Sequence, residues 1–353
     1  MAKTIVVLCG GQSTEHEIAL RSARTVINEL DKKKYEVVAY YVDKAGRFLS
    51  LGRRDHVDRP EDLMVESEAS VLSTIEAFAR DMDRLEDIMV FPVIHGQSGE
   101  DGQVQGFLQM LGLPYVGNGI MASALCMDKG YTNQVLADLG IPEAKYIIVE
   151  KKGLDRKVLM DRVEKDLGFP CFIKPCNNGS SVGVTKTSRE NFDRALDEAF
   201  AYDHKILVEE MIRGHELEVS VLGNAEAEAS KPGSYTTTRE VLDYEAKYLD
   251  RTLVENIPHP LSEEKTREIQ DLALRTYHAL GCEGLARVDI FYGEDGCFYV
   301  NEVNTLPGMT PTSLAPKMWT ALTDMTFSDY LDAIIRFGEE SYANRQALTY
   351  SWE

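Results

Sequence analysis

Long apolar runs are missing from this sequence. None approaches the roughly 18 residues that a membrane-spanning helix needs, so we expect no membrane span. The first 11 residues pass straight into a strand-like pattern and show none of the organisation of a cleavable signal. We therefore expect a cytoplasmic protein.

Basic residues are also scarce. The chain has 38 lysines and arginines against 58 aspartates and glutamates, which gives a formal net charge of −20. A nucleic-acid or anionic-membrane partner would require a basic face, so we exclude both kinds of partner. With 353 residues, of which 44% are hydrophobic, the chain is long enough for two or three ordinary globular domains.

Paired cysteine motifs are absent as well. The six cysteines form no C-x-x-C pair and no spacing that is typical of zinc ligands. Most of them lie in apolar runs, which predicts buried and reduced thiols. Cys176 is the expected exception, because it lies in a polar loop beside Lys174.

Strand and helix patterns alternate in the first third of the chain. Short apolar runs at 4–8, 35–42 and 88–94 are separated by segments with helical spacing. This alternation predicts an α/β domain with a parallel sheet that helices cover on both faces. Residues 45–75 show no clear periodicity, and we expect an irregular acidic insertion there.

The pattern changes after about residue 121. A long helix is predicted at 122–139, because Gly140 and Pro142 follow it. The later strands come in hairpin-like pairs, which is typical of an α+β domain. These pairs are 171–174 with 182–186 and 285–292 with 297–304.

The last predicted hairpin brings acidic residues together. An Asp-Gly pair at 295–296 predicts a two-residue turn. That turn would place Asp289 opposite Glu302, and Arg287 opposite Asn304. Two facing carboxylates repel, and a divalent cation such as Mg²⁺ between them would remove the conflict. The alternative is that one acid is protonated or turned to solvent.

A glycine-bearing polar loop follows the strand that ends at Lys174. Backbone N–H groups and serine hydroxyls in such a loop can bind phosphate oxygens, and the lysine adds a positive charge. The string G-S-S-V-G at 179–183 also fits a hydrolase elbow, but a β-like rather than a helical pattern follows it. A dinucleotide-type string at 117–122 lacks the second-strand acid that such a site needs. We therefore favour a phosphate loop.

Two residues near predicted strand ends are candidates for ligand contact. Glu17 lies in the string T-E-H-E at 14–17, where it fits either a capping box or a ligand contact. The residues alone leave both interpretations open. His95 ends a buried strand beside Gly96, a position that favours function over packing.

Seven strings in a fixed order resemble the D-alanine–D-alanine ligase family of ATP-grasp enzymes over nearly the whole chain. The order of the seven is far more specific than any one of them. The strings are G-G-Q-S-T-E-H-E-I-A-L (10–20), H-G-Q-S-G-E-D-G (95–102), M-A-S-A-L-C-M-D-K (121–129), I-K-P-C-N-N-G-S-S-V-G (173–183), Y-E-A-K-Y-L (244–249), R-V-D (287–289) and N-E-V-N-T-L-P-G-M-T-P-T-S-L (301–314).

The resemblance implies an α/β fold with the three domains of the ATP-grasp enzymes. An N-terminal parallel-sheet domain (1–122) would be followed by two α+β subdomains (123–215 and 216–353) that clamp ATP, with a lid loop at 231–260. ATP would be a substrate. The residues implied for ATP binding are Lys129, Lys174, Ser181, Glu209, Ile212, Glu216 and Lys247. The residues implied for two Mg²⁺ or Mn²⁺ ions are Asp289, Glu302 and Asn304.

The implied reaction joins two D-alanines into D-alanyl-D-alanine for peptidoglycan precursor synthesis. The first D-alanine would place its ammonium on Glu17, and its carboxylate would attack the γ-phosphate to give an acyl phosphate. The second D-alanine would dock its carboxylate on Ser313 and Leu314, and its amine would attack the acyl carbon. Arg287 and the Gly308 N–H would stabilise the developing oxyanion.

A closing lid is also implied by the resemblance. Ser180, Tyr248 and Glu17 would form a hydrogen-bonded set, Lys247 would reach toward phosphate, and His95 would contribute to substrate binding. Tyr248 favours an amine acceptor, since phenylalanine at the matching position goes with D-lactate use in relatives. The alternatives are a ligase that uses D-lactate or D-serine and a non-catalytic nucleotide-binding module. We also expect a homodimer.

Overall fold

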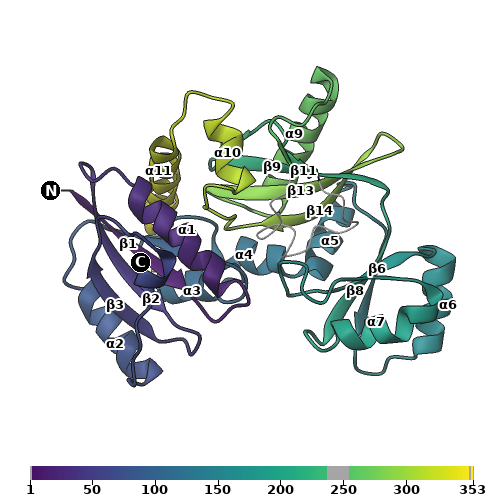
Figure 1. Cartoon of the computed structure of the whole chain (residues 1–353), viewed down its shortest axis with the longest axis horizontal. Coiled ribbons are helices and arrows are strands. Elements are labelled where there is room, and N and C mark those ends of the chain that lie inside the picture. Colours follow the sequence, from purple (N-terminus) through teal and green to yellow (C-terminus); the bar gives the residue numbers. More distant parts are fainter. Residues whose placement is uncertain (1, 237–253, 350, 353) are drawn as a thin grey trace.

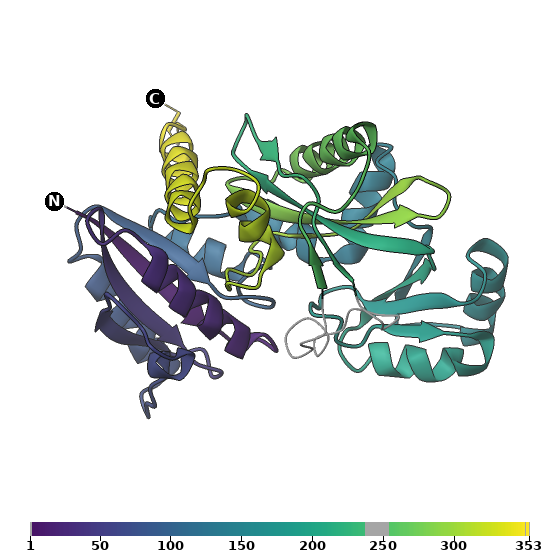
Figure 2. The same cartoon turned by 45° about the horizontal axis from the view of Figure 1, so that its top comes forward.

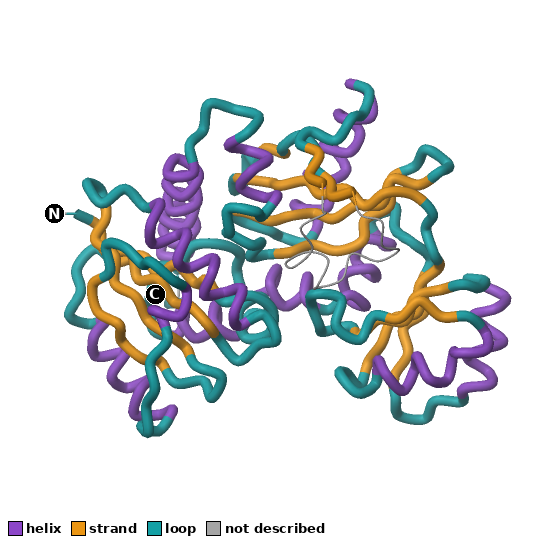
Figure 3. Tube along the Cα trace, in the orientation of Figure 1, coloured by secondary structure: helices purple, strands orange, loops and turns teal. Residues whose placement is uncertain are grey.

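The computed structural model describes residues 2–236, 254–349 and 351–352. Within these ranges, the strands form three four-stranded sheets and one two-stranded sheet (Figures 1 and 3). Helices pack against each of the larger sheets. No helix in the described ranges is long and apolar enough to cross a lipid bilayer.

The first sheet has the strand order β3-β2-β1-β4 and is built by the N-terminal third of the chain. β1 pairs in parallel with β2 and β4, as the alternating pattern predicts. β3 pairs antiparallel to β2 and lies in the segment 45–75, so the expectation of an irregular insertion is wrong there. Leu49 and Leu51 alternate with more exposed residues, which gives this short edge strand its buried face. The strands are β1 (Lys3–Gly10), β2 (Tyr35–Val42), β3 (Phe48–Arg53) and β4 (Ile88–Val93).

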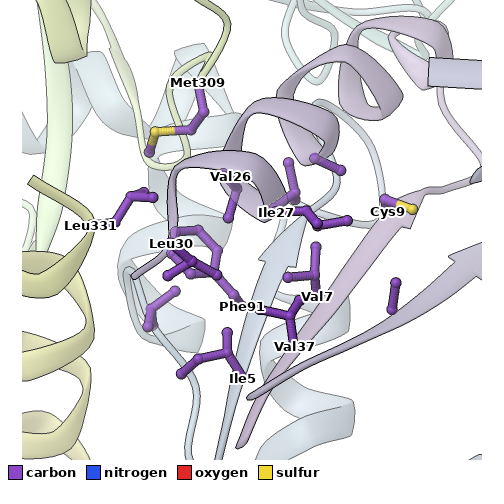
Figure 4. Close-up of a cluster of buried hydrophobic side chains, with 14 of the residues drawn as sticks. Ile5, Val7, Cys9, Val26, Ile27, Leu30, Val37, Phe91, Met309 and Leu331 are labelled. Carbon is purple, nitrogen blue, oxygen red and sulfur yellow. The ribbon is translucent and has the colours of Figure 1, made fainter. Parts of the chain in front are cut away.

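Side chains of β1 alternate between two apolar cores. Odd-numbered residues pack with α1, and even-numbered residues pack with α2 and α3. Figure 4 shows the α1 face, where Ile5 and Val7 lie near Val26, Ile27 and Leu30. The helices are α1 (His16–Glu29), η1 (Pro60–Leu63), α2 (Val71–Met82) and α3 (Gln103–Met110), of which η1 is a 3₁₀ helix.

The last helix returns to this first sheet. α11 (Phe327–Gln346) contributes Leu331 and Ile334 to the core that contains Ile5, and Met309 joins them from a preceding loop (Figure 4). Burying one such leucine is worth about 1.5–3 kcal/mol relative to leaving it exposed. The N-terminal core is therefore completed by residues from the other end of the chain.

The predicted helix at 122–139 is broken in two. α4 (Ile120–Met127) ends at Asp128, which has an extended backbone, and α5 (Lys129–Asp138) begins directly after it. The Asp128 carboxylate accepts a hydrogen bond from the Tyr131 N–H at 3.1 Å. The single-helix prediction is wrong because this aspartate starts a new helix by capping its first turn.

The middle sheet has the order β5-β8-β6-β7 and its own apolar core. β6 and β7 pair antiparallel with Cys171 opposite Thr187, which confirms that the first predicted pair of strands forms a hairpin. α6 and α7 cover this sheet with Val163 and Phe192, which are fully buried. The elements are β5 (Tyr146–Glu150), α6 (Arg156–Asp166), β6 (Cys171–Pro175), β7 (Thr185–Thr187), η2 (Arg189–Asn191), α7 (Phe192–Ala199) and β8 (Lys205–Glu210).

The C-terminal sheet has the order β10-β9-β13-β14, and α9 packs against it. β13 and β14 place Asp289 opposite Glu302 and Arg287 opposite Asn304, as predicted. The predicted two-residue turn is wrong, because a bulge at Asn301 shifts the pairing by one residue between this site and the tip. The elements are β9 (Gly214–Leu222), β10 (Glu228–Ala229), β11 (Ser234–Thr236), β12 (Val254–Asn256), α9 (Glu263–Ala279), β13 (Leu285–Gly293), β14 (Phe298–Asn304) and α10 (Leu314–Thr320).

Five of the six cysteines are buried, which agrees with the prediction from the apolar runs around most of them. Cys176, the expected exception, is fully buried, whereas Cys297 at the hairpin tip is exposed. The Cys176 N–H donates a hydrogen bond to the Lys205 carbonyl, and the Cys176 carbonyl accepts one from the Lys129 N–H. These bonds hold the residue beneath the polar loop that follows it.

Candidate active site

The hairpin β13–β14 carries the residues that were predicted for metal binding, together with Arg287. Arg287 donates from Nε and Nη2 to the two carboxylate oxygens of Asp289, each at 2.7 Å. Asn304 donates to the same carboxylate at 3.0 Å. Asp289 is fully buried, so its negative charge depends on this bidentate ion pair.

Glu302 faces Asp289 but has a cation of its own. Lys129 Nζ lies 3.1 Å from a Glu302 carboxylate oxygen. Basic side chains therefore relieve the repulsion between the two acids, which is a third solution beside metal binding and protonation. Burial alone would lower the pKa of Lys129, but the neighbouring Glu302 outweighs it and the pKa is raised.

A narrow cavity lies where these residues meet. Its lining includes Glu100 after β4, Lys129 at the start of α5, Asn178 in the loop after β6, and Glu302 and Asn304 of β14. The cavity has a volume of about 20 Å³, which is room for roughly one water molecule. Residues from three sheets thus converge on one point.

The hairpin residues fit a hard divalent cation in their chemistry. Asp289, Glu302 and Asn304 offer carboxylate and amide oxygens, which Mg²⁺ accepts alongside water and phosphate oxygens. Within the described part of the chain, no three His, Cys, Asp or Glu side chains are grouped to hold a metal ion. A cation at the hairpin would therefore need further ligands from a bound nucleotide.

Lys174 connects several residues that were predicted for nucleotide binding. Its Nζ forms an ion pair with Glu209 and donates to Asn301 Oδ1 at 3.1 Å. Asn301 in turn donates to Glu216 at 2.8 Å. These contacts join β6, β8, β14 and β9 in one polar network. Ile212 lies partly exposed between β8 and β9.

The loop after β6 reaches the N-terminal part of the molecule. Ser180 and Ser181 have φ values of 52° and 57°, a left-handed conformation that residues other than glycine rarely adopt. The Ser180 hydroxyl donates to the Glu15 carboxylate. A Cβ atom at Gly179 would lie 3.2 Å from that carboxylate, so glycine leaves room for the close approach.

The structure does not bring Glu17 to Ser180. α1 begins at His16 without a side-chain capping bond, so the capping box at 14–17 does not form. The Glu17 side chain is 56% exposed and lies 2.7 Å from Lys44, and this contact lowers its pKa. The expected hydrogen bond is wrong because the acid in the turn before the helix, Glu15, takes the position beside the serine.

His95 is buried just after β4, and protein groups hold its ring on both sides. Nδ1 lies 3.0 Å from the Leu306 carbonyl, and Nε2 lies 2.8 Å from the Ser22 hydroxyl. Glu100 lies 3.6 Å from Nδ1. Burial would lower the pKa of His95, but Glu100 raises it above its ordinary value. The ring therefore ties the loop at residue 306 to the N-terminal sheet.

The loop before α10 holds the residues predicted for the second substrate. The Ser313 hydroxyl accepts a hydrogen bond from the Thr310 N–H at 3.1 Å and lies 2.8 Å from the Thr310 hydroxyl. A Cβ atom at Gly308 would lie only 2.7 Å from the Ser313 hydroxyl, so this close approach requires glycine. Leu314 is buried as the first residue of α10.

Two predicted residues lie outside the described residues. Lys247 and Tyr248 fall within 237–253, so their lid contacts remain predictions. On either side of this range, β11 and β12 pair with each other. Tyr235 of β11 donates its hydroxyl to the Thr312 carbonyl at 2.9 Å. The base of the expected lid therefore touches the loop that carries Ser313.

Asn118 is a site residue that the sequence did not reveal. Its amide donates to the Leu285 and Thr305 carbonyls at 2.6 and 2.8 Å and accepts from the Glu283 N–H at 2.8 Å. These bonds fasten the end of the N-terminal segment to the start of β13 and to the residue that follows β14. The only signal was the G-N-G string at 117–119, which fitted a dinucleotide motif poorly.

Glu15, Glu100 and Asn301 were also missed. Glu15 and Glu17 share one string, and the start of α1 decides which acid faces the loop. Glu100 lies five residues after His95 in the string H-G-Q-S-G-E-D-G. The string was recognised, but it did not predict which residue Glu100 contacts. Asn301 precedes Glu302 and becomes a network member only through the bulge.

Known proteins resemble this chain along its whole length. The profile described as D-ala D-ala ligase N-terminus matches residues 4–118, and the profile described as D-ala D-ala ligase C-terminus matches residues 135–336. A D-alanine–D-alanine ligase from Geobacillus thermodenitrificans is 40% identical over 365 aligned positions, which cover 100% of both chains.

Solved structures agree with these matches. The D-alanine–D-alanine ligase from Coxiella burnetii has a TM-score of 0.79 at 32% identity, covering 98% of this chain and 97% of that chain. The VanG D-Ala:D-Ser ligase from Enterococcus faecalis has a TM-score of 0.80 at 31% identity, covering 96% and 100%. Identity at this level over 96–100% of this chain establishes that it belongs to the D-alanine–D-alanine ligase family.

Proposed function

We propose that this protein uses ATP to join two D-alanine molecules, giving D-alanyl-D-alanine, ADP and phosphate for peptidoglycan precursor synthesis. The full-length match to ligases of this family carries the proposal. The convergence of Lys129, Glu302 and Asn304 at one cavity supports it. Such a site can stabilise the charge that develops during phosphoryl and acyl transfer.

ATP would bind along the network around Lys174. Lys129 and Lys174 already have carboxylate partners, so phosphate binding would exchange one anion for another. The phosphates would meet Lys129, Lys174 and Ser181, with Lys247 as a further expected contact. The adenine would meet Glu209 and Ile212, and the ribose would meet Glu216.

Asp289, Glu302 and Asn304 would hold two Mg²⁺ or Mn²⁺ ions. Bound divalent cations neutralise charge on the phosphoryl group during transfer. Arg287 shares the Asp289 carboxylate, so the same aspartate orients a guanidinium next to the cation site.

The first D-alanine would attack the γ-phosphorus with its carboxylate oxygen, which forms an acyl phosphate and releases ADP. Glu15, rather than Glu17, would hold its ammonium group. Glu15 is bonded to Ser180 in the phosphate loop, whereas Glu17 is paired with Lys44 at the surface. His95 would act indirectly, by holding the loop at 306.

The second D-alanine would dock its carboxylate at Ser313 and Leu314. Its amine would attack the acyl carbon, expel phosphate and lose a proton to form the peptide bond. Arg287 and the Gly308 N–H would stabilise the oxyanion of the tetrahedral intermediate. Arg287 suits this role because Asp289 fixes its guanidinium before substrate binds.

The decisive experiment measures ATP-dependent phosphate release with D-alanine, D-serine and D-lactate as acceptors, and identifies the products by mass spectrometry. D-serine is included because of the similarity to the VanG D-Ala:D-Ser ligase. We expect D-alanyl-D-alanine as the main product at neutral pH, as Tyr248 predicts. A product that is mostly D-alanyl-D-serine or depsipeptide would overturn this acceptor assignment. ATP binding without phosphate release would identify a non-catalytic module instead.

The division into domains 1–122, 123–215 and 216–353 and the lid at 231–260 remain part of this proposal. The three larger sheets support the division, with α11 added to the first domain's core.

We also propose a cytoplasmic homodimer, for which the exposed side chains Met110 and Met121 offer an apolar surface. Light scattering of the purified chain, with Met110→Lys and Met121→Lys variants, tests this assembly. A monomer in the unmodified chain would overturn it.

A further inference from the structure

A second cavity lies outside the cleft described above. It has a volume of about 210 Å³ and is lined by Arg21, Arg24 and Thr25 of α1, Pro60 of η1 and residues 310–312. Figure 2 shows α1 alongside the segment that leads into α10. The cavity is about ten times larger than the one beside Glu302, and none of its lining residues has a role in the proposed reaction.

Two guanidinium groups give this cavity its charge. Arg21 and Arg24 are one turn apart on α1, which places them on the same face. Arg24 donates from Nε to the Asp58 carbonyl, and within the described residues neither arginine has a carboxylate at ion-pair distance. Paired N–H groups of arginine match carboxylate and phosphate oxygens.

A chain of hydroxyl groups leads from this cavity to Ser313. The Thr312 and Thr310 hydroxyls lie 3.1 Å apart, and the Thr310 and Ser313 hydroxyls lie 2.8 Å apart. Each hydroxyl has one hydrogen to donate, so the direction of donation along the chain can be reversed. If Thr312 donates to an anion in the cavity, Thr310 donates to Thr312 and Ser313 donates to Thr310. Ser313 then presents lone pairs, rather than a hydrogen, to an acceptor carboxylate.

We propose that this arginine cavity binds a small oxyanion, a carboxylate or a phosphate, and that its occupancy weakens acceptor binding at Ser313. The binding site stands on its own residues, whereas the effect on the acceptor rests on the proposed function. The reaction itself yields both kinds of oxyanion, as the carboxylate of the dipeptide and as inorganic phosphate. The cavity would therefore act as a product-sensing site.

The first test measures binding by calorimetry without ATP or metal. The probes are inorganic phosphate and D-alanyl-D-alanine, used separately, and a saturating non-hydrolysable ATP analogue is added in a parallel series to block the nucleotide cleft. We expect a dissociation constant on the order of 1 mM, since the guanidiniums are partly solvated. Arg21→Gln/Arg24→Gln should weaken binding roughly tenfold or more for the probe that the cavity selects. The probe affected identifies the source as phosphate or carboxylate.

The matched control is Arg54→Gln/Arg336→Gln, which removes two other arginines that have no ion-pair partner among the described residues, and it should bind as the unmodified chain does. Arg21→Gln alone guards against misfolding, because Arg21 is exposed. Equal binding of both probes by the unmodified chain and by Arg21→Gln/Arg24→Gln would overturn the site. Binding that is intact in a chain that makes no dipeptide would overturn the proposed function and leave the site in place.

The second test measures the KM of the acceptor D-alanine at saturating ATP, with increasing concentrations of the selected probe. The KM should rise severalfold in the unmodified chain. It should not rise in Thr312→Val, which lacks the hydroxyl at the cavity end of the chain but keeps the contact between Thr310 and Ser313. An acceptor KM that stays constant in the unmodified chain, or rises equally in Thr312→Val, would overturn the coupling.

Discussion

The C-terminal hairpin and the start of α1 hold their carboxylates by different means. In the hairpin, Asp289 and Glu302 are paired by the strand ladder, and each has a cation, Arg287 or Lys129. At the start of α1, Glu15 lies in a turn and is held by a hydroxyl from a loop of another sheet. The hairpin acids keep their places by local geometry, whereas the place of Glu15 depends on contact between two parts of the molecule.

This difference separates two kinds of site residue. A strand presents its side chains in fixed pairs, so one change in the hairpin removes a group without moving its neighbours. A turn before a helix offers no such pairing, and Glu15 and Glu17 meet entirely different partners although they are two residues apart. Changes in the hairpin should therefore affect chemistry, and changes at the turn should affect binding.

The largest expected effect comes from the hairpin acids. Asp289→Asn or Glu302→Gln should lower kcat by roughly a thousandfold or more, because each removes a charged ligand of the proposed cation site. The fold should persist, because asparagine and glutamine keep the size of the side chains they replace and Glu218, 3.2 Å from Arg287, still pairs with the buried guanidinium. Steady-state phosphate release and circular dichroism check this outcome. Glu294→Gln, at the exposed tip of the same hairpin, is the control. If either variant keeps the kcat of the unmodified chain at saturating Mg²⁺, the cation assignment is ruled out.

The next effect concerns Asn118, which fastens the N-terminal segment to the hairpin. Asn118→Ala should lower the free energy of unfolding by about 2–4 kcal/mol, because two buried backbone carbonyls and one half-buried N–H lose their partner. Urea unfolding measures the change, with Asn344→Ala on the exposed side of α11 as the control. A change below roughly 1 kcal/mol would mean that the hairpin is positioned without this residue.

A smaller effect distinguishes the two acids of α1. Glu15→Gln should raise the KM of the first D-alanine by about tenfold to a hundredfold, since it removes the charge that would face the ammonium. Glu17→Gln should leave that KM nearly unchanged and cost at most about 1 kcal/mol of stability, because it breaks only a surface ion pair. The reverse ranking of the two KM values would restore Glu17 as the ligand contact.

The smallest effect is a pH dependence outside both regions. Burial, with a smaller contribution from Glu209, raises the pKa of Glu143 to about 8, and one of its oxygens has no hydrogen-bond partner among the described residues. A carboxyl with a raised folded pKa stabilises the fold fully below its unfolded pKa, near 4.5, and loses that contribution as the pH rises toward 8. Glu143→Gln mimics the protonated form.

The measurement is the free energy of unfolding of Glu143→Gln from pH 4.5 to pH 9. Above pH 8 the variant should exceed the unmodified chain by about 1 kcal/mol, well below the full shift because the carboxyl is partly exposed and screened. Near pH 4.5 the two should coincide. Glu150→Gln, at the exposed end of β5, is the control. A stability difference that is independent of pH would contradict the assigned pKa.

Strand patterns predicted the fold best. The alternation in the first 100 residues gave β1, β2 and β4 nearly to the residue, and the two hairpins were paired correctly. β3 was missed, because its alternating pattern is only six residues long and lies within an acidic segment. The break at Asp128 was also missed. An aspartate can occur within a helix, and only the structure shows that this one caps the next helix.

The candidate site was likewise predicted only where a local sequence pattern determines which residues meet. The pairing of Asp289 with Glu302 depends on strand geometry, so the sequence predicted it even though the turn at the tip was wrong. The partner of Ser180 depends on how the loop after β6 meets the turn before α1, and 165 residues separate the two. No local pattern encodes such a meeting, and the choice between Glu15 and Glu17 was therefore open.

The return of α11 to the first sheet has a consequence for synthesis on the ribosome. Leu331 and Ile334 complete the core around Ile5 and Val7, yet they emerge about 240 residues after the end of β4. At about 5–20 residues per second, that face of the first sheet waits roughly 12–48 s for its last helix. The middle sheet has a core of its own and can close during this interval. The first sheet, although it is translated first, therefore has the core that is finished last.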